Sequence, residues 1–429
     1  MRRLHPGQAG RRPAVAVALL LVAGLAGCRS LAPAPPGPSP EPRWFRGNVH
    51  THTLWSDGDS APEAVVDWYA AHGYDFLVIS DHNILPEGEF WRQIGVGYKL
   101  AHPEHVAELR ARYGEGAVAV RPRAAGGEEL RLATMRELRT RFERPGGFLL
   151  LTAEEISDRF EGRPIHHGAV NVGRKIAPPG GATVRELMRR TLALVAAEGR
   201  RTGRPVLGHL NHPNYEWGVA AEDLAAVVEE RFFEVYNGLR LVRNEGDATH
   251  RSSEAIWDHV LAVRLAEMAD VEAPPLWALA TDDAHDFREI PGVSNPGRGW
   301  VVVRATELTP DAILSGLLAG DFYASSGVAL RAVERSDEGL AVEVEPAPGV
   351  AYTIRFIGTR GRPGDTVADL AVGETLAEVS GVRAVYRFRG DELYVRAVVV
   401  SDRRHPNGYA EGDRETAWTQ PALPGRPGR

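Results

Sequence analysis

The stretch Asn48-Val-His50-Thr-His52-Thr-Leu-Trp-Ser56-Asp57-Gly58 places two histidines and an aspartate directly after a short apolar run. His50 and His52 stand at alternate positions as the chain leaves a predicted strand, so their side chains point the same way. Both imidazoles can therefore meet one metal ion, and Asp57 can return from the following turn to a second. Taken alone the pair is weak evidence, because surface and core histidines are common.

The chain up to residue 303 repeats one theme, in which a short apolar run is followed by an amphipathic stretch. The apolar runs cover residues 45–49, 76–80, 148–153, 169–172, 206–210, 232–236, 277–281 and 300–303. Continuous runs of this kind are typical of strands in a buried parallel sheet. Helices are predicted at residues 62–72, 184–198, 221–230, 253–270 and 310–319. The alternation predicts βαβ units, arranged as a barrel or as an open doubly wound sheet.

Histidines and carboxylates stand at the ends of nearly all these predicted strands. They are Asp81, His82, Glu154, Glu155, His166, His167, His209, His212, Asp282, Asp283 and His285. Chance placement of the 15 histidines in the chain would rarely produce this pattern. Parallel α/β folds gather their strand ends at one rim, where active sites form, so we expect these donors to converge there.

In chain order, several short motifs together resemble the signature of the PHP (polymerase and histidinol phosphatase) superfamily across residues 44–303. The motifs are His50-x-His52, Ser56-Asp57-Gly58, Asp81-His82, Glu155-Ile-Ser, a histidine after Ile165, His212-Pro213 and Asp283-Ala-His285. The resemblance implies a distorted (β/α)7 barrel whose mouth binds two or three divalent transition metal ions, either zinc, manganese or iron. The ligands it implies are His50, His52, Asp57, His82, Glu155, His166, His212, Asp283 and His285. Among them, Asp57, His212 and Asp283 are the candidates for catalysis.

Two of these positions have a neighbour that competes for the same role. Glu154 competes with Glu155, and the resemblance favours Glu155 because it directly precedes an apolar-Ser pair. His167 competes with His166, and His166 is preferred because it directly follows the apolar pair Pro164-Ile165.

Five further polar residues have other candidate roles. His209 is a candidate partner of a ligand. Asp81 and Asp282 are candidates to orient ligating imidazoles through their second ring nitrogens, or else to cap turns. Arg240 and Arg298 are candidates to hold the oxygens of a phosphate, since guanidinium groups match that geometry. The alternative for each arginine is a surface or ion-paired side chain.

The remaining sequence predicts how the chain is divided. Residues 43–327 are predicted to form the barrel, with charged and largely helical sequence at 86–147 inserted near the mouth of the site. Alternating patterns between glycine and proline turns predict a small antiparallel β domain over residues 328–423. Residues 424–429 are predicted to be a disordered tail.

The N-terminus is typical of an export signal. An arginine-bearing start precedes an apolar run too short to span a bilayer, which predicts a signal peptide over residues 1–27. The segment Leu25-Ala-Gly-Cys28 resembles the bacterial lipobox, which implies a lipid on Cys28 and attachment to a bacterial membrane, with the outer membrane favoured. Residues 28–42, rich in proline, are predicted to be a flexible tether. The alternatives are a plain signal peptide or a short transmembrane anchor.

Composition and the donor set define the functional hypotheses. The formal net charge of -7 argues against nonspecific nucleic-acid binding through a broad basic face. Mixed imidazole and carboxylate ligands suit zinc, manganese or iron better than magnesium. We therefore predict a phosphoesterase that attacks a small phosphorylated substrate with a hydroxide bridged by the metal ions. The alternatives are hydrolysis of carboxylic esters, carbamates or amides, and a non-catalytic lipoprotein that binds an envelope component or glycan.

Overall fold

The structure is a computed structural model that describes residues 41–271 and 273–425. The predicted signal peptide, Cys28 and nearly all of the predicted tether lie outside the described residues, as do the last residues of the predicted tail. None of the helices in the described ranges combines the length and the apolar composition that a membrane crossing requires.

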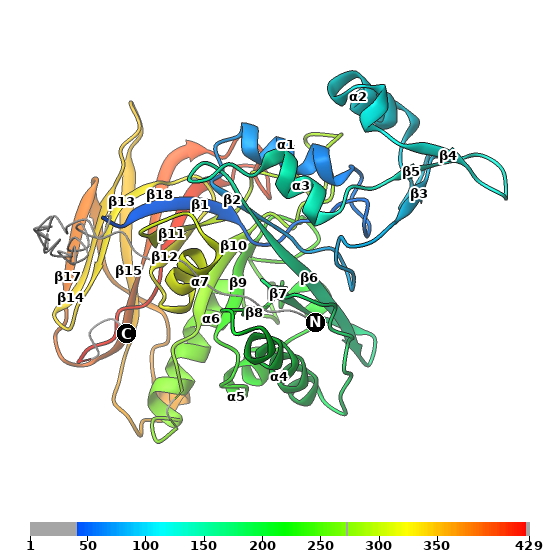
Figure 1. The fold of residues 1–429 in the computed structure, drawn as a ribbon. Helices are drawn as coiled ribbons and strands as arrows, with labels where there is room; N and C mark the ends of the chain where they lie inside the picture. The colour runs from blue at the N-terminus through cyan, green and yellow to red at the C-terminus, as the bar shows by residue number, and fades with distance from the viewer. Residues whose placement is uncertain (1–40, 272, 426–429) are drawn as a thin grey trace, which may run out of the picture. The chain divides into compact units, whose positions relative to one another are not determined.

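The fold is mixed α/β and is built around a thirteen-stranded sheet (Figure 1). Its strands lie in the order β10-β9-β8-β7-β6-β2-β1-β11-β12-β19-β18-β15-β16. Each predicted apolar run overlaps one of its first eight strands, although the run at 169–172 meets only the end of its strand. These are β1 (Arg43–Asn48), β2 (Phe76–Ile79), β6 (Leu149–Phe160), β7 (Arg163–Val170), β8 (Leu207–Leu210), β9 (Phe232–Asn237), β10 (Trp277–Thr281) and β11 (Trp300–Ala305).

Two of these eight strands depart from the predicted parallel arrangement. Strands β1, β2 and β6 pair in parallel, as do β8, β9 and β10. Strand β7 is antiparallel to both of its neighbours, and β11 is antiparallel to β1. The reason for β7 is the turn before it, because only Glu161 and Gly162, with φ of +49° and +81°, separate β6 from β7. A two-residue turn joins antiparallel strands, whereas a parallel pair needs a crossover of a dozen or more residues.

The ends of β1 and β10 lie side by side, although no ladder joins these two strands among the described residues. An isolated parallel bridge links Thr51 to Ala284, and the N–H of His52 donates to the carbonyl oxygen of Ala284 at 3.0 Å. One buried apolar cluster takes side chains from all eight strands and from α7 (Pro310–Leu318). A shared core of this kind favours the barrel, which remains a prediction.

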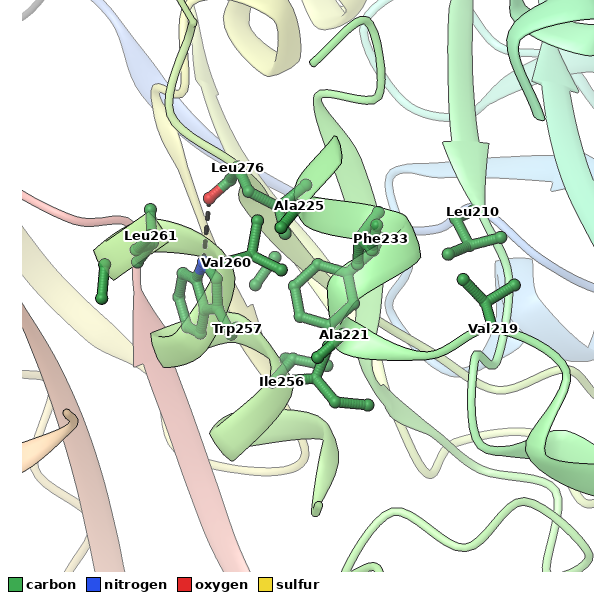
Figure 2. Packing of buried hydrophobic residues seen from close by; sticks show 14 of the residues in the cluster. Leu210, Val219, Ala221, Ala225, Phe233, Ile256, Trp257, Val260, Leu261 and Leu276 are labelled. Atoms are coloured by element: carbon green, nitrogen blue, oxygen red, sulfur yellow. Dashed lines mark hydrogen bonds between the residues drawn. The ribbon is translucent and has the colours of Figure 1, made fainter. Parts of the chain in front are cut away.

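Helices lie close to the predicted positions. They are α1 (Pro62–Ala71), α4 (Val184–Thr202), the short α5 (Ala221–Ala226), and α6 (Ser253–Ala262), which continues as a π-helix over Val263–Glu267. Thr183 and Ser252 accept hydrogen bonds from N–H groups of the first turns of α4 and α6 and so cap them. In Figure 2, Trp257 of α6 is buried in an apolar cluster with Phe233 of β9, and its indole N–H donates to the carbonyl oxygen of Leu276 at 2.8 Å.

The insertion at residues 86–147 is only partly helical. It contains α2 (Pro103–Tyr113), a short 3-10 helix (Glu115–Ala117), α3 (Met135–Phe142) and a separate antiparallel sheet in the order β3 (Trp91–Gln93), β5 (Glu128–Arg131), β4 (Val120–Pro122). These strands are short and carry charged cross-strand pairs such as Arg121 with Glu129. Their sequence therefore lacks the apolar alternation by which a strand is predicted.

The C-terminal region pairs antiparallel throughout, as its alternating pattern predicts. Its elements are β12 (Phe322–Ser325), β13 (Leu330–Arg335), β14 (Gly339–Val344), β15 (Tyr352–Arg360), β16 (Glu374–Ser380), β17 (Arg383–Arg387), β18 (Glu392–Arg404) and β19 (Arg414–Thr419). Strands β13, β14 and β17 form their own sheet, whereas β12 pairs with both β11 and β19. Through β12, most of this region continues the central sheet.

Candidate metal centre

All nine predicted metal ligands come together at one place. Their side chains form four overlapping groups in which the potential ligand atoms lie within 4.8 Å of one another. The groups are His52, Asp57, His82 and His285; His50, His52 and Glu155; His50, His212 and Asp283; and His82, Glu155 and His166. The chain therefore has a His/Asp/Glu cluster that is able to bind metal.

A tight loop after β1 presents the first donors. His50 and His52 are fully buried, and their Nε2 atoms lie 3.1 Å apart. The Asp81 carboxylate accepts hydrogen bonds from the backbone N–H groups and hydroxyls of Thr53 and Ser56, at 2.6 to 3.1 Å. Asp81 thus caps this turn, and it does so instead of orienting an imidazole, which was its other predicted role.

Asp57 lies between two histidines that come from other strands. Its Oδ1 is 3.4 Å from Nε2 of His285, and its Oδ2 is 3.4 Å from Nε2 of His82. The hydroxyl of Ser157 lies 2.6 Å from Nδ1 of His82, and such a partner fixes the orientation of a metal-binding ring. Tyr98, which belongs to the insertion, donates its hydroxyl to Oδ2 of Asp57 at 2.9 Å.

Glu155 occupies the middle of the cluster. It lies in β6 just beyond the residues that pair with β2, and it is fully buried. Its Oε1 is 3.0 Å from Nδ1 of His166 and 3.1 Å from Nε2 of His212. The same oxygen accepts a hydrogen bond from the amide of Asn211 at 2.9 Å. Oε2 of Glu155 lies 2.5 Å from Nδ1 of His82, so this carboxylate touches groups from three other segments of the chain.

Strand alternation separates the ligands from their competitors along β6 and β7. Because successive side chains in a strand point to opposite faces, only one of each neighbouring pair faces the cluster. Glu154 points away from Glu155 and accepts a hydrogen bond from a backbone N–H. His167 points away from His166, with its Nε2 3.1 Å from a carboxylate oxygen of Glu230. In both pairs the residue preferred from the sequence is the one that lies in the cluster.

His209 does not act as the predicted partner of a ligand. Its ring is fully buried opposite Gly168 in the β7–β8 pair and makes no hydrogen bond within the described part of the chain. Burial lowers the pKa of His209 to about 4, so the ring is neutral at pH 7.

Glu234 supports two predicted ligands, a role that no motif in the sequence predicts. Its Oε1 lies 2.7 Å from Nδ1 of His50, and its Oε2 accepts a hydrogen bond from the backbone N–H of His212 at 2.8 Å. Thr281 donates its hydroxyl to Oε1 at 2.8 Å. The available signal was a single acidic residue inside the apolar run at 232–236, where an unpaired charge would be costly.

His212 and Asp283 both adopt a left-handed backbone conformation, with φ of +25° and +48°. Residues other than glycine seldom adopt positive φ, and those that do concentrate at functional sites. Oδ1 of Asp283 lies 3.1 Å from Nε2 of His52 and 3.3 Å from Nε2 of His50. The amide of Asn237 donates to Oδ2 at 3.1 Å. The local strain therefore coincides with the placement of two predicted ligands.

Asp282 and the two arginines do not join the cluster. Asp282 accepts hydrogen bonds from the Tyr69 hydroxyl and from the backbone N–H groups of residues 297–299, so it caps a loop. Arg298 is fully buried, and its guanidinium donates to oxygens of Gly238, Gly292, Val293, Asn295 and Asn407. The prediction that Arg298 binds phosphate is wrong, because no donor is left for a ligand. Arg240 is exposed, donates to the carbonyl oxygen of Gly408, and does not line the cavity above the centre.

In the metal-free centre Glu155 and His52 have the protonation states that bind metal, whereas neighbouring carboxylates outweigh burial and raise the pKa of His50, His82 and His285. Burial raises the pKa of Glu155, but the charges of His82, His166 and His50 outweigh it and hold that pKa well below its usual range. Burial also lowers the pKa of His52 to about 3, with further lowering by its histidine neighbours. Anionic carboxylates and neutral imidazoles are the forms that coordinate a cation.

A cavity of about 670 Å³ opens above the cluster. Seven of the nine donors line it, whereas His50 and His52 are buried behind them. This volume lies within the range of about 300–1,000 Å³ that is typical of small-molecule sites. A larger cavity of about 1050 Å³ lies between α6 and strands β15 and β18, but two of its buried charged groups, Arg396 and Asp258, pair with each other.

Comparisons with known proteins give distant likenesses only. No family model matches the chain, and no curated protein matches it. Among solved structures it is similar to a two-domain protein from Bacteroides vulgatus containing a predicted PHP-like metal-dependent phosphoesterase, at 14% identity, with a TM-score of 0.38 and coverage of 89% of this chain and 95% of that one. PsfC from Pseudomonas syringae aligns at 12% identity with a TM-score of 0.31, covering 64% of this chain and 88% of that one. A candidate metal-dependent phosphoesterase from Bifidobacterium adolescentis aligns at 12% identity with a TM-score of 0.27, covering 60% and 94%.

We expect the protein as purified with a divalent metal to hold two or three ions per chain. His52→Ala should lose at least one ion, because His52 belongs to two of the four ligand groups. Metal content measured by plasma mass spectrometry checks this, with His250→Ala as the control, since His250 is a surface histidine of which 42% of the side chain is exposed. Full metal content in His52→Ala would contradict the assignment.

Metal affinity should rise with pH. In the metal-free protein burial opposes the charged form of His285, but the hydrogen bond to Asp57 and the charge of Asp283 outweigh it and raise the pKa to about 9. A cation that binds His285 at pH 7 therefore displaces a proton, and this cost disappears as the pH rises through 9. We expect roughly a tenfold gain in affinity per pH unit for each proton displaced.

Competition titrations against a chelator between pH 6.5 and 9 measure this slope. In His285→Gln the slope should be smaller by about one proton. An affinity that does not change with pH would show that His285 is not protonated before metal binds.

Proposed function

We propose that the chain is a metal-dependent hydrolase of the PHP type that cleaves phosphate esters. The observation that supports this is the convergence of nine imidazole and carboxylate donors at the floor of an open cavity. Structural metal sites are closed by four protein ligands, whereas catalytic sites keep a position open to substrate. A cluster that lines a cavity of about 670 Å³ fits the catalytic kind.

The donor set fits divalent transition metals. Imidazole nitrogens and carboxylate oxygens together suit zinc, manganese or iron, and the overlap of the four groups gives room for two or three ions. When bound, such ions neutralise charge on phosphoryl oxygens and make water acidic enough to ionise near pH 7.

The residues of the chain hold and orient this centre. Glu234 and Ser157 fix the second ring nitrogens of His50 and His82, which sets the direction of the other nitrogen. The three predicted catalytic residues, Asp57, His212 and Asp283, line the cavity and so can reach a bound substrate. We propose that one of them supplies the proton that the leaving group needs.

A phosphate ester is favoured over other substrates because several clustered cations match the charge of a phosphoryl group in both ground and transition states. Hydrolysis of carboxylic esters, carbamates or amides by the same centre is the second candidate. The third is binding of an envelope component or glycan without turnover.

The test uses the full-length chain loaded with Mn²⁺ or Zn²⁺ on phosphomonoester, phosphodiester, carboxylic ester and amide substrates. We expect phosphate-ester hydrolysis that a chelator abolishes and added metal restores. Asp283→Asn should lower kcat by at least about 100-fold, since even loss of a residue that only supports a metal ligand costs 10- to 100-fold.

Asp247→Asn is the matched control for this test, because Asp247 is a surface aspartate with 42% of its side chain exposed. Hydrolysis of carboxylic esters alone would favour the second candidate. Metal binding without turnover of any substrate would favour the third.

We further propose that the protein is exported and held on a bacterial membrane by a lipid on Cys28, preferably at the outer membrane and facing the periplasm or the cell surface. The support is the sequence Leu25-Ala-Gly-Cys28 after an apolar run. Expression with a labelled fatty acid should give a labelled, membrane-bound protein. Cys28→Ser should lose both the label and the membrane association, and a labelled Cys28→Ser protein would refute the proposal.

A further inference from the structure

One wall of the cavity above the metal centre is apolar, and nothing in the proposed chemistry uses it. Leu239, Leu241 and Val293 line this wall. The exposed fractions are 57% for Leu241 and 48% for Val293. Single exposed apolar residues are common on proteins, but a group of them inside a cavity lined by metal donors is a feature of ligand sites.

Arg298 holds the two segments of this apolar wall together. Its Nη1 donates to the carbonyl oxygens of Gly238 and Val293, both at 2.7 Å. The backbone N–H of Arg240 also donates to the carbonyl oxygen of Val293, at 3.0 Å. The buried guanidinium therefore joins the segment that carries Leu239 and Leu241 to the segment that carries Val293.

The C-terminal region supports the same wall from outside. Nε of Arg298 donates to the carbonyl oxygen of Asn407, and the Tyr409 hydroxyl donates to the carbonyl oxygen of Val242. Both residues lie between β18 and β19. A wall fixed at this many points keeps its shape before ligand arrives, and preorganisation of this kind reduces the entropy lost on binding.

The insertion contributes to the cavity beside Asp57. Tyr98 is 75% exposed, yet its hydroxyl donates a hydrogen bond to the Asp57 carboxylate at 2.9 Å. Tyr98 thus places an aromatic ring next to the predicted ligands. Tyr215 adds a second ring to the cavity lining. Aromatic rings offer large apolar area with few rotatable bonds.

A phosphoryl group would fill only a small part of a cavity of about 670 Å³. We propose that this site takes phosphate esters whose organic group is apolar, with the phosphorus end at the metal ligands and the organic group against Leu239, Leu241 and Val293. This inference rests on the proposed function for the position of the phosphorus end.

The experiment compares binding of ethylphosphonate and n-hexylphosphonate, which differ only by four methylene groups and cannot be hydrolysed. Calorimetric titration uses the full-length chain loaded with Mn²⁺. Each fully buried methylene gives roughly a fourfold gain in affinity, so partial burial of four should make hexylphosphonate bind at least about tenfold more tightly. In Leu241→Ser and Val293→Ser this ratio should fall below about threefold.

Leu194→Ser is the matched control, because Leu194 of α4 is 41% exposed and does not line this cavity. Its ratio should equal that of the wild type. The inference is overturned by a wild-type ratio below about threefold, by a ratio that neither cavity variant changes, or by failure of the metal-loaded protein to bind either phosphonate. Hydrolysis of ethyl and hexyl phosphate tests the proposed function separately, since tight hexylphosphonate binding without turnover supports the apolar wall and refutes the phosphoesterase.

Discussion

The burial of Glu155 is the constraint on which the rest of the structure depends. A carboxylate with no exposed surface is tolerated only if cations or hydrogen-bond donors surround it. Here His166, His212 and Asn211 contact one oxygen and His82 contacts the other, and these residues come from three separate segments of the chain. Folding must therefore bring the strand ends together before this charge is compensated. The same arrangement makes the centre a place where a divalent cation is favourable.

The polar centre is supported by parts of the chain that do not face it. Asp81 and Asp282 accept hydrogen bonds that fix two loops. Glu234 contacts the ring of His50 and accepts a hydrogen bond from the backbone N–H of His212. Such support positions ligand atoms more narrowly than packing alone, because each carboxylate accepts several directed hydrogen bonds. The predicted ligands are thus held in a network of further buried polar residues.

The first eight strands of the central sheet and the clustering of the donors could be predicted from the sequence, because both leave local signals. Apolar runs mark buried strands, and the resemblance to the PHP motifs favours Glu155 and His166 over their neighbours. The roles of Arg298 and Glu234 could not be predicted in the same way. An arginine selects its acceptors from loops that only the folded chain brings near, and residues 238, 292 and 407 share no spacing in the sequence. The antiparallel course of β7 depends on a two-residue turn, Glu161-Gly162, in charged sequence that lies between two predicted apolar runs.

The turn between β6 and β7 sets a register in which Gly168 lies opposite His209 of β8. Adjacent histidines at 166 and 167 suggest that β7 could slide by one residue and still present an imidazole to the cluster of donors. Such a slide would place Ala169 opposite His209, where a β-carbon at position 168 would already overlap the ring. The register of β7 therefore depends on the absence of a β-carbon at Gly168. Lengthening the turn between β6 and β7 by one residue would push a β-carbon into the ring of His209, and so would disrupt the packing beneath the cluster before it exchanged His166 for His167.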